Sequence, residues 1–350
     1  MLAKAVKSFD ALPQRPGGYL FEPKWDGFRG LVVNDGATIE IASRGSKPLT
    51  RYFPELVETF AEQVPPGCIL DGELILRRGR PGAERLDWPT LAQRIHPAQS
   101  RIRMLAEQTP ASFVAFDMLA VAGRSLQDEP FEHRRAQLER VAEPFRAPVH
   151  LSRVTKDSAV AMRWFTDFEG AGLDGVIAKP AAEVYQPGKR AIFKLKHART
   201  ADVVLLGYRV HKSGQGIGSL LLGLYTDDGE LAMVGGAASF TAKRRMELLE
   251  QLRPLVVRDE NDEPVRCAGD QNRFSSGKDT SFMRLRPEVV AEVAYDQMEG
   301  HRFRHTVQLK RFRPDRDPRS CTYEQLRMPA AHDLDAVLTG TSGSGNGTAV

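Results

Sequence analysis

A change of sequence pattern near residue 200 constrains the fold more than any other feature of this chain. Before it, strand-like apolar runs alternate with longer amphipathic stretches that have the length of helices. After it, the apolar runs are short and β-rich, and one predicted helix at residues 241–252 interrupts them. Two such patterns in a chain of 350 residues predict two domains, each long enough to bury a core.

Apolar periodicity and turn residues predict the individual elements. In the first part, strands are expected at residues 19–21, 31–33, 39–42, 69–76 and 112–119. Helices are expected there at residues 54–63, 90–95, 131–142 and 158–170. In the second part, strands are expected at residues 203–210, 219–226, 231–237 and 289–297. This second pattern favours a small β-barrel over a doubly wound fold.

The boundary between the two parts is expected at residues 197–201. We therefore predict a first domain at residues 1–198, a second at 199–328 and a C-terminal tail at 329–350. From Gly340 onward the tail is rich in Gly, Ser and Thr, which predicts disorder for its last part.

Composition excludes several classes of protein. No apolar run approaches the roughly 18 residues of a membrane span, and the first residues lack the apolar core of a secretion signal. The three cysteines are isolated, which disfavours a disulfide framework and a cysteine zinc site. A cytoplasmic protein is therefore expected.

Positive charge is concentrated in two segments, although the net charge is only +4. Residues 186–199 contain five Lys or Arg and no acid, and residues 301–319 contain seven Lys or Arg and two Asp. A solvated face explains either run alone. Two runs interleaved with apolar residues favour a polyanionic partner.

Several common nucleotide and hydrolase motifs are absent. The sequence has no G-x-x-x-x-G-K-[ST], no complete G-x-G-x-x-G, no H-E-x-x-H and no G-x-S-x-G. A nucleotide, if used, must be held in another way.

The segment E-P-K-W-D-G-F-R at residues 22–29 is the first positive signal. Lys24 lies between a proline and an aromatic residue and precedes an acid-glycine turn. Partial burial and nearby cations favour the neutral amine that a nucleophile needs. The alternative is an ordinary Lys-Asp pair in a surface loop, because K-x-D-G also occurs by chance.

Further segments follow Lys24 in a fixed order: S-R-G at 43–45, L-D-G-E-L at 70–74, F-V-A-F-D at 113–117, D-G-V-I-A-K at 174–179, F-K-L-K at 193–196 and R-P-D-R at 313–316. This series resembles the motifs of ATP-dependent DNA ligases and related covalent nucleotidyltransferases, over nearly the whole chain. Among them, the chain is most similar to the short stand-alone bacterial ligase C type. The resemblance implies an α+β fold, with a nucleotidyltransferase domain of antiparallel sheets and helices followed by an OB-fold barrel.

The resemblance also implies roles for individual residues. Lys24 would be the nucleophile that carries AMP, and Phe116 would stack on the base. Residues implied to bind the nucleotide or its phosphates are Glu22, Arg29, Arg44, Glu73, Phe116, Lys179, Lys194 and Lys196. Glu73 and Asp174 would hold Mg²⁺, or Mn²⁺ in its place. Arg313, Asp315 and Arg316 of the second domain would orient pyrophosphate.

Physical arguments bear on some of these residues independently. Lys194 and Lys196 flank Leu195 on a predicted strand, so both should point to one face while Leu195 enters the core. Asp71 and Glu73 share one face of an apolar strand and therefore need a metal or a Lys or Arg partner.

Two residues depart from the family pattern. Asp174 stands where glutamate is usual, and Arg316 stands where lysine is usual. Both keep their charge, so activity is expected to survive.

The implied reaction has three steps: Lys24 takes AMP from ATP, AMP passes to the 5′-phosphate of a nick, and the 3′-hydroxyl then displaces it. The expected partners are nicked duplex DNA and DNA-repair polymerases or nucleases, with no membrane. A monomer associated with the bacterial nucleoid is expected.

Four alternative functions can be weighed against this one. An mRNA-capping-type guanylyltransferase would use GTP, and RNA ligases generally lack the OB domain and the sixth motif. NAD⁺-dependent ligases need a four-cysteine zinc site, which three cysteines cannot supply. A nick-binding platform without catalysis would form no adenylate.

Overall fold

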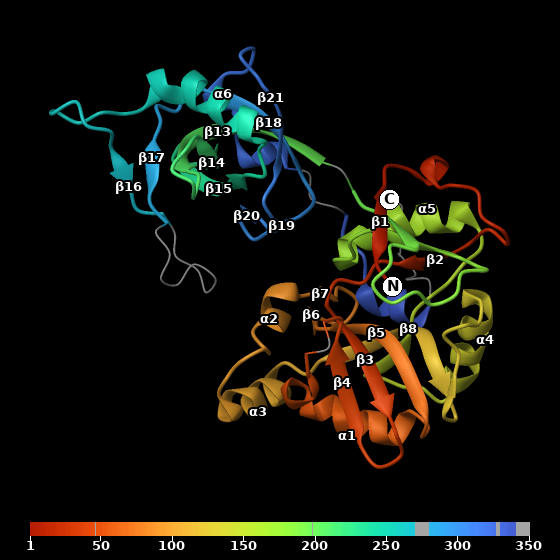
Figure 1. Ribbon diagram of the computed structural model, residues 1–350. Coiled ribbons are helices and arrows are strands. Elements are labelled where there is room, and N and C mark those ends of the chain that lie inside the picture. The colour runs from red at the N-terminus through yellow and green to blue at the C-terminus, as the bar shows by residue number, and fades with distance from the viewer. Residues whose placement is uncertain (46, 198, 270–279, 327–329, 341–350) are drawn as a thin grey trace, which may run out of the picture. The chain divides into compact units, whose positions relative to one another are not determined.

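The computed structural model describes residues 1–45, 47–197, 199–269, 280–326 and 330–340. The chain divides into two compact units: unit 1 combines Met1–Lys196 with Pro329–Val350, and unit 2 is His197–Met328. In Figure 1, the colours from red to light green mark most of unit 1, and the colours from green to blue mark unit 2. Unit 2 is therefore an insertion between two segments of unit 1.

Unit 1 is built on two sheets. The larger has the order β10-β8-β5-β3-β4, with β9 paired to β8. Its strands are β3 (Phe28–Asn34), β4 (Ile39–Ser43), β5 (Cys68–Ile75), β8 (Ser112–Val121), β9 (Arg124–Ser125) and β10 (Val149–Leu151). The smaller has the order β1-β12-β11-β2, formed by β1 (Ala3–Val6), β2 (Tyr19–Pro23), β11 (Val176–Pro180) and β12 (Ile192–Leu195). Pairing is antiparallel except for β1 with β12 and β10 with β8.

Helices pack against the larger sheet because their apolar faces and the apolar side chains of the sheet form one buried core. Helix α1 (Pro54–Gln63) contacts β4, and α4 (Phe131–Ala142) lies along β8 (Figure 1). Leu56 and Phe60, four residues apart on α1, are both fully buried in the core of this sheet. The other elements here are α2 (Trp88–Ala92), α3 (Gln99–Gln108), α5 (Ser158–Asp167) and the short ladder of β6 (Arg77–Arg78) with β7 (Arg85–Leu86).

Unit 2 is a curled antiparallel sheet of the OB-fold type. Its central strand β13 pairs with β14, β17 and β18. The strands are β13 (Arg199–Val210), β14 (Ile217–Tyr225), β15 (Leu231–Ala237), β16 (Arg266–Cys267), β17 (Phe282–Arg284), β18 (Val290–Tyr295), β19 (Met298–Glu299), β20 (Arg302–Phe303) and β21 (Gln308–Phe312). Helix α6 (Ala242–Leu252) buries Leu248 and Leu252 against the barrel core. The expected α+β architecture with a second β-barrel domain is confirmed.

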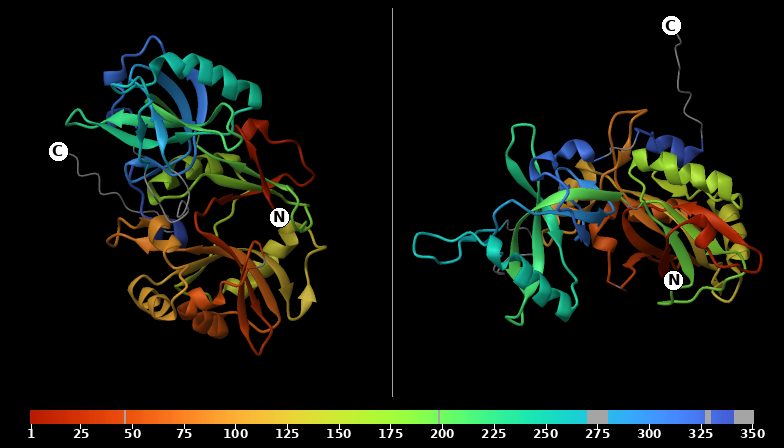
Figure 2. Two further views of the ribbon diagram at one scale, coloured as in Figure 1. Left: turned by 60° about the vertical axis from the view of Figure 1, so that its left-hand side comes forward. Right: turned by 90° about the horizontal axis from the view of Figure 1, so that it is seen from above.

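The C-terminal segment differs from the expected tail. Residues 334–339 form helix α7 (Leu334–Thr339), whose Leu334, Val337 and Leu338 belong to the same buried cluster of unit 1 as Trp164 and Phe168. In the right-hand view of Figure 2, this blue helix lies beside the yellow-green helix α5. Helix α7 therefore contributes to the core of unit 1. The disorder expected at the end of the tail concerns residues 341–350, which lie outside the described residues.

No helix in the described parts of the chain is both long enough and apolar enough to cross a membrane.

Candidate active site

Backbone hydrogen bonds bring the first and fourth sequence motifs together. The Lys24 N–H donates to the Gly175 carbonyl at 2.9 Å, and the Asp174 N–H donates to the Lys24 carbonyl at 3.1 Å. Gly175 has φ +109°, and a Cβ there would lie 2.0 Å from the carbonyl oxygen of Leu195. Only glycine fits that position, which explains the glycine of the D-G-V-I-A-K motif.

Two lysines from separate motifs, Lys24 and Lys196, contact the same carboxylate oxygen of Asp174, which belongs to a third motif. The Nζ atoms of Lys24 and Lys196 each lie 2.7 Å from Asp174 Oδ2. Lys194, on β12, completes this lysine cluster (Lys24, Asp174, Lys194 and Lys196). The cluster has three cations and one carboxylate, so it presents excess positive charge to a polyphosphate.

The pKa values follow from this arrangement. Although burial opposes it, the ammonium groups of Lys24 and Lys196 hold the pKa of Asp174 below its usual range. Burial lowers the pKa of Lys194, and repulsion from Lys196 and Lys24 lowers it further.

A second group of side chains, the aromatic cluster (Glu22, Arg29, Asp71, Phe116 and Lys179), lies on β2, β3, β5, β8 and β11. Lys179 Nζ is 2.8 Å from Glu22 Oε2 and 4.6 Å from the centroid of the Phe116 ring. The Lys179 and Glu22 side chains are only 4% and 3% exposed. The charge of Lys179 is therefore balanced by Glu22, and Lys179 supports the Phe116 ring from one face.

Arg29 supplies the cation that the Asp71 carboxylate needs. Its Nε lies 2.8 Å from Asp71 Oδ1, its Nη2 bonds Oδ2, and its guanidinium is 5.8 Å from the Phe116 ring centroid. The Tyr185 hydroxyl also donates to Asp71 Oδ2 at 3.2 Å. The expected Lys or Arg partner of Asp71 is thus confirmed. Tyr185 was not predicted, because it lies between the fourth and fifth motifs where no spacing pattern marks it.

Glu73 sits between the two clusters. Its Oε1 accepts the Gly27 N–H at 3.2 Å, and a Cβ on Gly27 would lie 2.0 Å from the Leu74 carbonyl oxygen. Burial raises the pKa of Glu73 to about 8, against the attraction of Lys24 and Arg29. The Glu73 carboxyl therefore holds its proton near neutral pH.

No group of three or more His, Cys, Asp or Glu side chains forms a metal site within the residues described. Mg²⁺ typically keeps several waters and takes one or two carboxylates together with substrate phosphates. Glu73 and Asp174 are two hard oxygen donors that both interact with Lys24, and they fit such an ion when Glu73 is deprotonated.

The Glu73 pKa predicts a pH dependence of stability. The pKa in the folded protein, about 8, exceeds the ordinary 4.5, so the stabilisation is complete below about pH 4.5 and is lost as pH rises through about 8. Relative to Glu73→Gln, the wild type should lose about 2–4 kcal/mol between about pH 5 and pH 8.5. Urea unfolding of both proteins at the two pH values measures this. A constant difference would contradict the assignment.

Each of the remaining predicted residues is described within its own unit. Arg44 follows β4 with an exposed side chain. In unit 2, Arg313 Nη1 donates to both Asp202 carboxylate oxygens at 3.2 and 3.1 Å, and Arg313 Nε donates to Asp315 at 3.0 Å. Arg316 Nε is 3.6 Å from the same Asp202 carboxylate.

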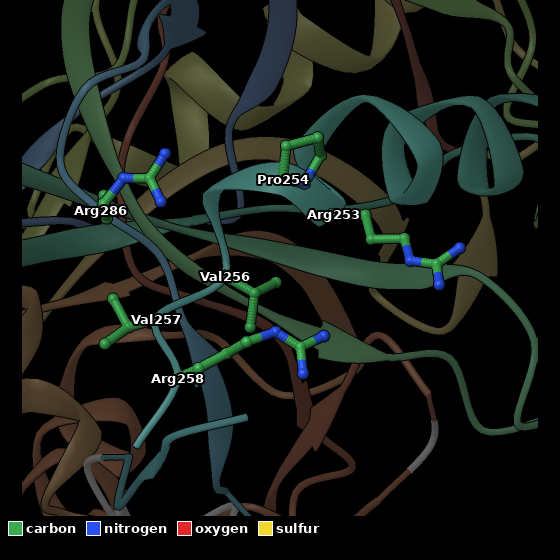
Figure 3. Close-up of a pocket in the computed structure, with 6 residues that line it drawn as sticks. All are labelled: Arg253, Pro254, Val256, Val257, Arg258 and Arg286. Atoms are coloured by element: carbon green, nitrogen blue, oxygen red, sulfur yellow. The ribbon is translucent and has the colours of Figure 1, made fainter. Parts of the chain in front are cut away.

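A cavity of about 610 Å³ lies entirely within unit 2. Its lining consists of Arg253, Pro254, Val256, Val257, Arg258 and Arg286, which Figure 3 draws as sticks. None of the predicted site residues lines it. Two of its arginines are balanced by acids, Arg258 by Asp262 and Arg286 by Glu288.

Comparison with known proteins agrees with the site. A family model described as "ATP dependent DNA ligase domain" matches residues 1–196, and "ATP dependent DNA ligase C terminal region" matches residues 213–316. The chain is 53% identical to DNA ligase C1 of Mycolicibacterium smegmatis over 97% of this chain and 96% of that protein. It is 49% identical to DNA ligase C of Mycobacterium tuberculosis, with the same coverage.

A solved structure of a Lig E DNA ligase is 18% identical, with a TM-score of 0.55, and the match covers 89% of this chain and 98% of that one. At this identity the likeness concerns the fold. The chain belongs to the ATP-dependent DNA ligase family. It is an enzyme that uses ATP to seal nicks in DNA.

Proposed function

We propose that Lys24 is the nucleophile of this ligase and carries AMP during the reaction. The observation that carries the proposal is the meeting of Lys24, Asp174 and Lys196 at one carboxylate oxygen. Asp174 aims the Lys24 amine, while Lys194 and Lys196 add the positive charge that a triphosphate requires.

In the first step, Lys24 Nζ loses one proton to solvent to become a neutral amine, forms a bond to the α-phosphorus of ATP and loses a second proton to solvent, which leaves a neutral phosphoramidate nitrogen. The bond to the bridging oxygen breaks at the same time, and pyrophosphate leaves. The reaction needs an in-line approach and neutralised phosphate charge rather than a strong acid or base. The lysine cluster, with Arg44 reaching a phosphate, would supply these conditions.

The aromatic cluster would hold the nucleoside. Phe116 would stack on adenine, with its ring fixed by Lys179 and Arg29 on their buried carboxylate partners Glu22 and Asp71. Mg²⁺ or Mn²⁺ held by Glu73 and Asp174 would neutralise phosphate charge.

The later steps would use the same site on DNA. The 5′-phosphate oxygen of the nick takes AMP from Lys24, and the 3′-hydroxyl then displaces AMP to form the phosphodiester bond. Arg313, Asp315 and Arg316 would act earlier, by orienting pyrophosphate during the first step.

The substrate also suggests where the enzyme works. A nick with a 5′-phosphate and a 3′-hydroxyl arises when a polymerase fills a gap and a nuclease trims the end, so such repair enzymes would act immediately before it. We propose that the protein works as a monomer in the bacterial cytoplasm, on nucleoid DNA.

Incubation with α-labelled ATP or α-labelled GTP, followed by denaturing electrophoresis, tests the function. We expect label on the protein from ATP, discharged by added pyrophosphate, and little from GTP. Labelling by GTP alone would instead indicate a guanylyltransferase, and no label from either nucleotide would indicate a non-catalytic nick-binding protein.

A further inference from the structure

Asp202 holds both arginines of the R-P-D-R motif through one carboxylate. It lies on β13 and is 13% exposed at its side chain. Arg313 Nη1 donates to its two oxygens at 3.2 and 3.1 Å, and Arg316 Nε is 3.6 Å from Oδ2. The two hydrogen bonds fix the direction of the Arg313 guanidinium, and Arg316 is attracted to the same carboxylate by charge.

The backbone of Asp202 is itself fixed by a residue beyond the motif. The Asp202 N–H donates to Gln325 Oε1 at 2.7 Å, and Gln325 Nε2 donates to the Asp202 carbonyl at 2.9 Å. Gln325 also donates to the Thr322 carbonyl at 2.9 Å. The R-P-D-R motif and the chain that follows it are therefore both tied to Asp202 on β13.

Two other acids near Arg313, Asp315 and Glu292, do not link it to Arg316. Asp315 bonds Nε and Nη2 of Arg313 but is exposed and only two residues away in the sequence. Glu292, opposite Asp202 on β18, is 3.9 Å from Arg313 and bonds Arg311 at 2.7 Å. Among these acids, Asp202 alone links Arg313 to Arg316 within the residues described.

We infer that Asp202 is the positioning residue that sets the orientation of Arg313 and Arg316 for transfer of AMP to Lys24. This inference depends on the proposed role of these arginines in the first step. In this role, Asp202 would act through the two guanidinium groups and not by touching ATP or DNA itself. Loss of the Asp202 carboxylate should therefore slow lysine-AMP formation, which releases pyrophosphate. It should leave the sealing of a pre-adenylated nick unchanged, because that step does not involve pyrophosphate.

Two single-turnover measurements on the full chain test this. The first is the rate of lysine-AMP formation from ATP, and the second is the sealing of a pre-adenylated nick without ATP. Asp202→Asn keeps the size of the side chain but removes its charge. It should slow the first rate about 10- to 100-fold, because small misplacements of catalytic groups cost that much. The second rate should change less than about twofold.

Three further variants make the result decisive. Asp202→Glu, which restores the carboxylate, should recover part of the first rate. Glu288→Gln, which breaks an exposed ion pair with Arg286 in the same unit, should change neither rate. Arg313→Ala should slow the first rate at least as much as Asp202→Asn.

The outcomes separate the inference from the proposed function. If Arg313→Ala leaves lysine-AMP formation unchanged, the proposed role of the arginine is wrong. If Arg313→Ala slows that step and Asp202→Asn does not, the positioning role of Asp202 is overturned. Equal slowing of both rates by Asp202→Asn would also overturn it, because that result indicates a general structural role in unit 2.

Discussion

Replacing Lys24 with arginine is expected to reduce nick sealing from ATP by about 10⁴-fold or more, the scale seen when an enzyme loses its nucleophile. Arginine keeps the positive charge and can still pair with Asp174, so the site should stay folded. It remains protonated at accessible pH and cannot attack phosphorus. Sealing rates from ATP on a nicked duplex measure the effect.

Two controls isolate the chemical defect. Sealing of a pre-adenylated nick does not need the Lys24 amine, so Lys24→Arg should keep at least about a tenth of that rate. Lys4→Arg, which changes an exposed lysine on β1, should behave as wild type. Normal sealing from ATP by Lys24→Arg would show that another group accepts AMP.

Truncation after residue 328 is expected to lower the free energy of unfolding of unit 1 by on the order of 5 kcal/mol. The change removes Leu334 and Val337, both fully buried, together with Leu338. It exposes the apolar surface that Trp164 and Phe168 present to α7. It also removes the bond from Arg77 Nη2 to Asp335 at 2.6 Å. Thermal unfolding of the truncated and full chains measures the loss.

A matched truncation after Gly340 keeps α7 and removes only the last ten residues. It should unfold at the same temperature as the full chain. The point variant Val337→Asp should reproduce most of the destabilisation, because it places an unpaired charge in the same buried position. Equal stability of the chain ending at residue 328 would contradict the assignment of α7 to the core of unit 1.

Local signals predicted most of the elements around the site. The apolar runs at residues 69–76 and 112–119 correspond to β5 and β8, and the helix expected at 54–63 coincides with α1. The helix expected at 158–170 ends at Asp167 and continues as a 3-10 helix over Phe168–Ala171. The differences arise at ends, where hydrogen bonding depends on packing rather than on local sequence.

Long-range pairings could not be predicted in the same way. Strand β1 has only four residues, and it forms by parallel pairing with β12, nearly 190 residues later in the sequence. Helix α3 (Gln99–Gln108) carries mostly polar residues and was missed, although Ile102 and Leu105 are buried. Helix α7 contacts unit 1 only after the whole of unit 2 has intervened in the sequence.

In the site, too, the motif residues were predicted from the sequence but several of their long-range partners were not. Motif order predicted Lys24, Asp174, Lys194 and Lys196, and the fold brings them together. Motif spacing could not show that Lys179 pairs with Glu22 next to the Phe116 ring. Lys24 and Lys196 pair with a different carboxylate, that of Asp174. The buried pair of Asp117 with Arg134, at 2.8 and 2.9 Å, was also missed, because its partner lies on α4 outside every motif.

The proposed reaction requires that Lys24 receives AMP. Mass spectrometry of proteolytic fragments from protein incubated with ATP and a divalent cation, without DNA, tests it most directly. We expect one AMP per chain, on the fragment containing Lys24, and we expect it to disappear when nicked DNA is added and sealed. AMP on Lys179, Lys194 or Lys196, or an adduct that nicked DNA does not discharge, would contradict it.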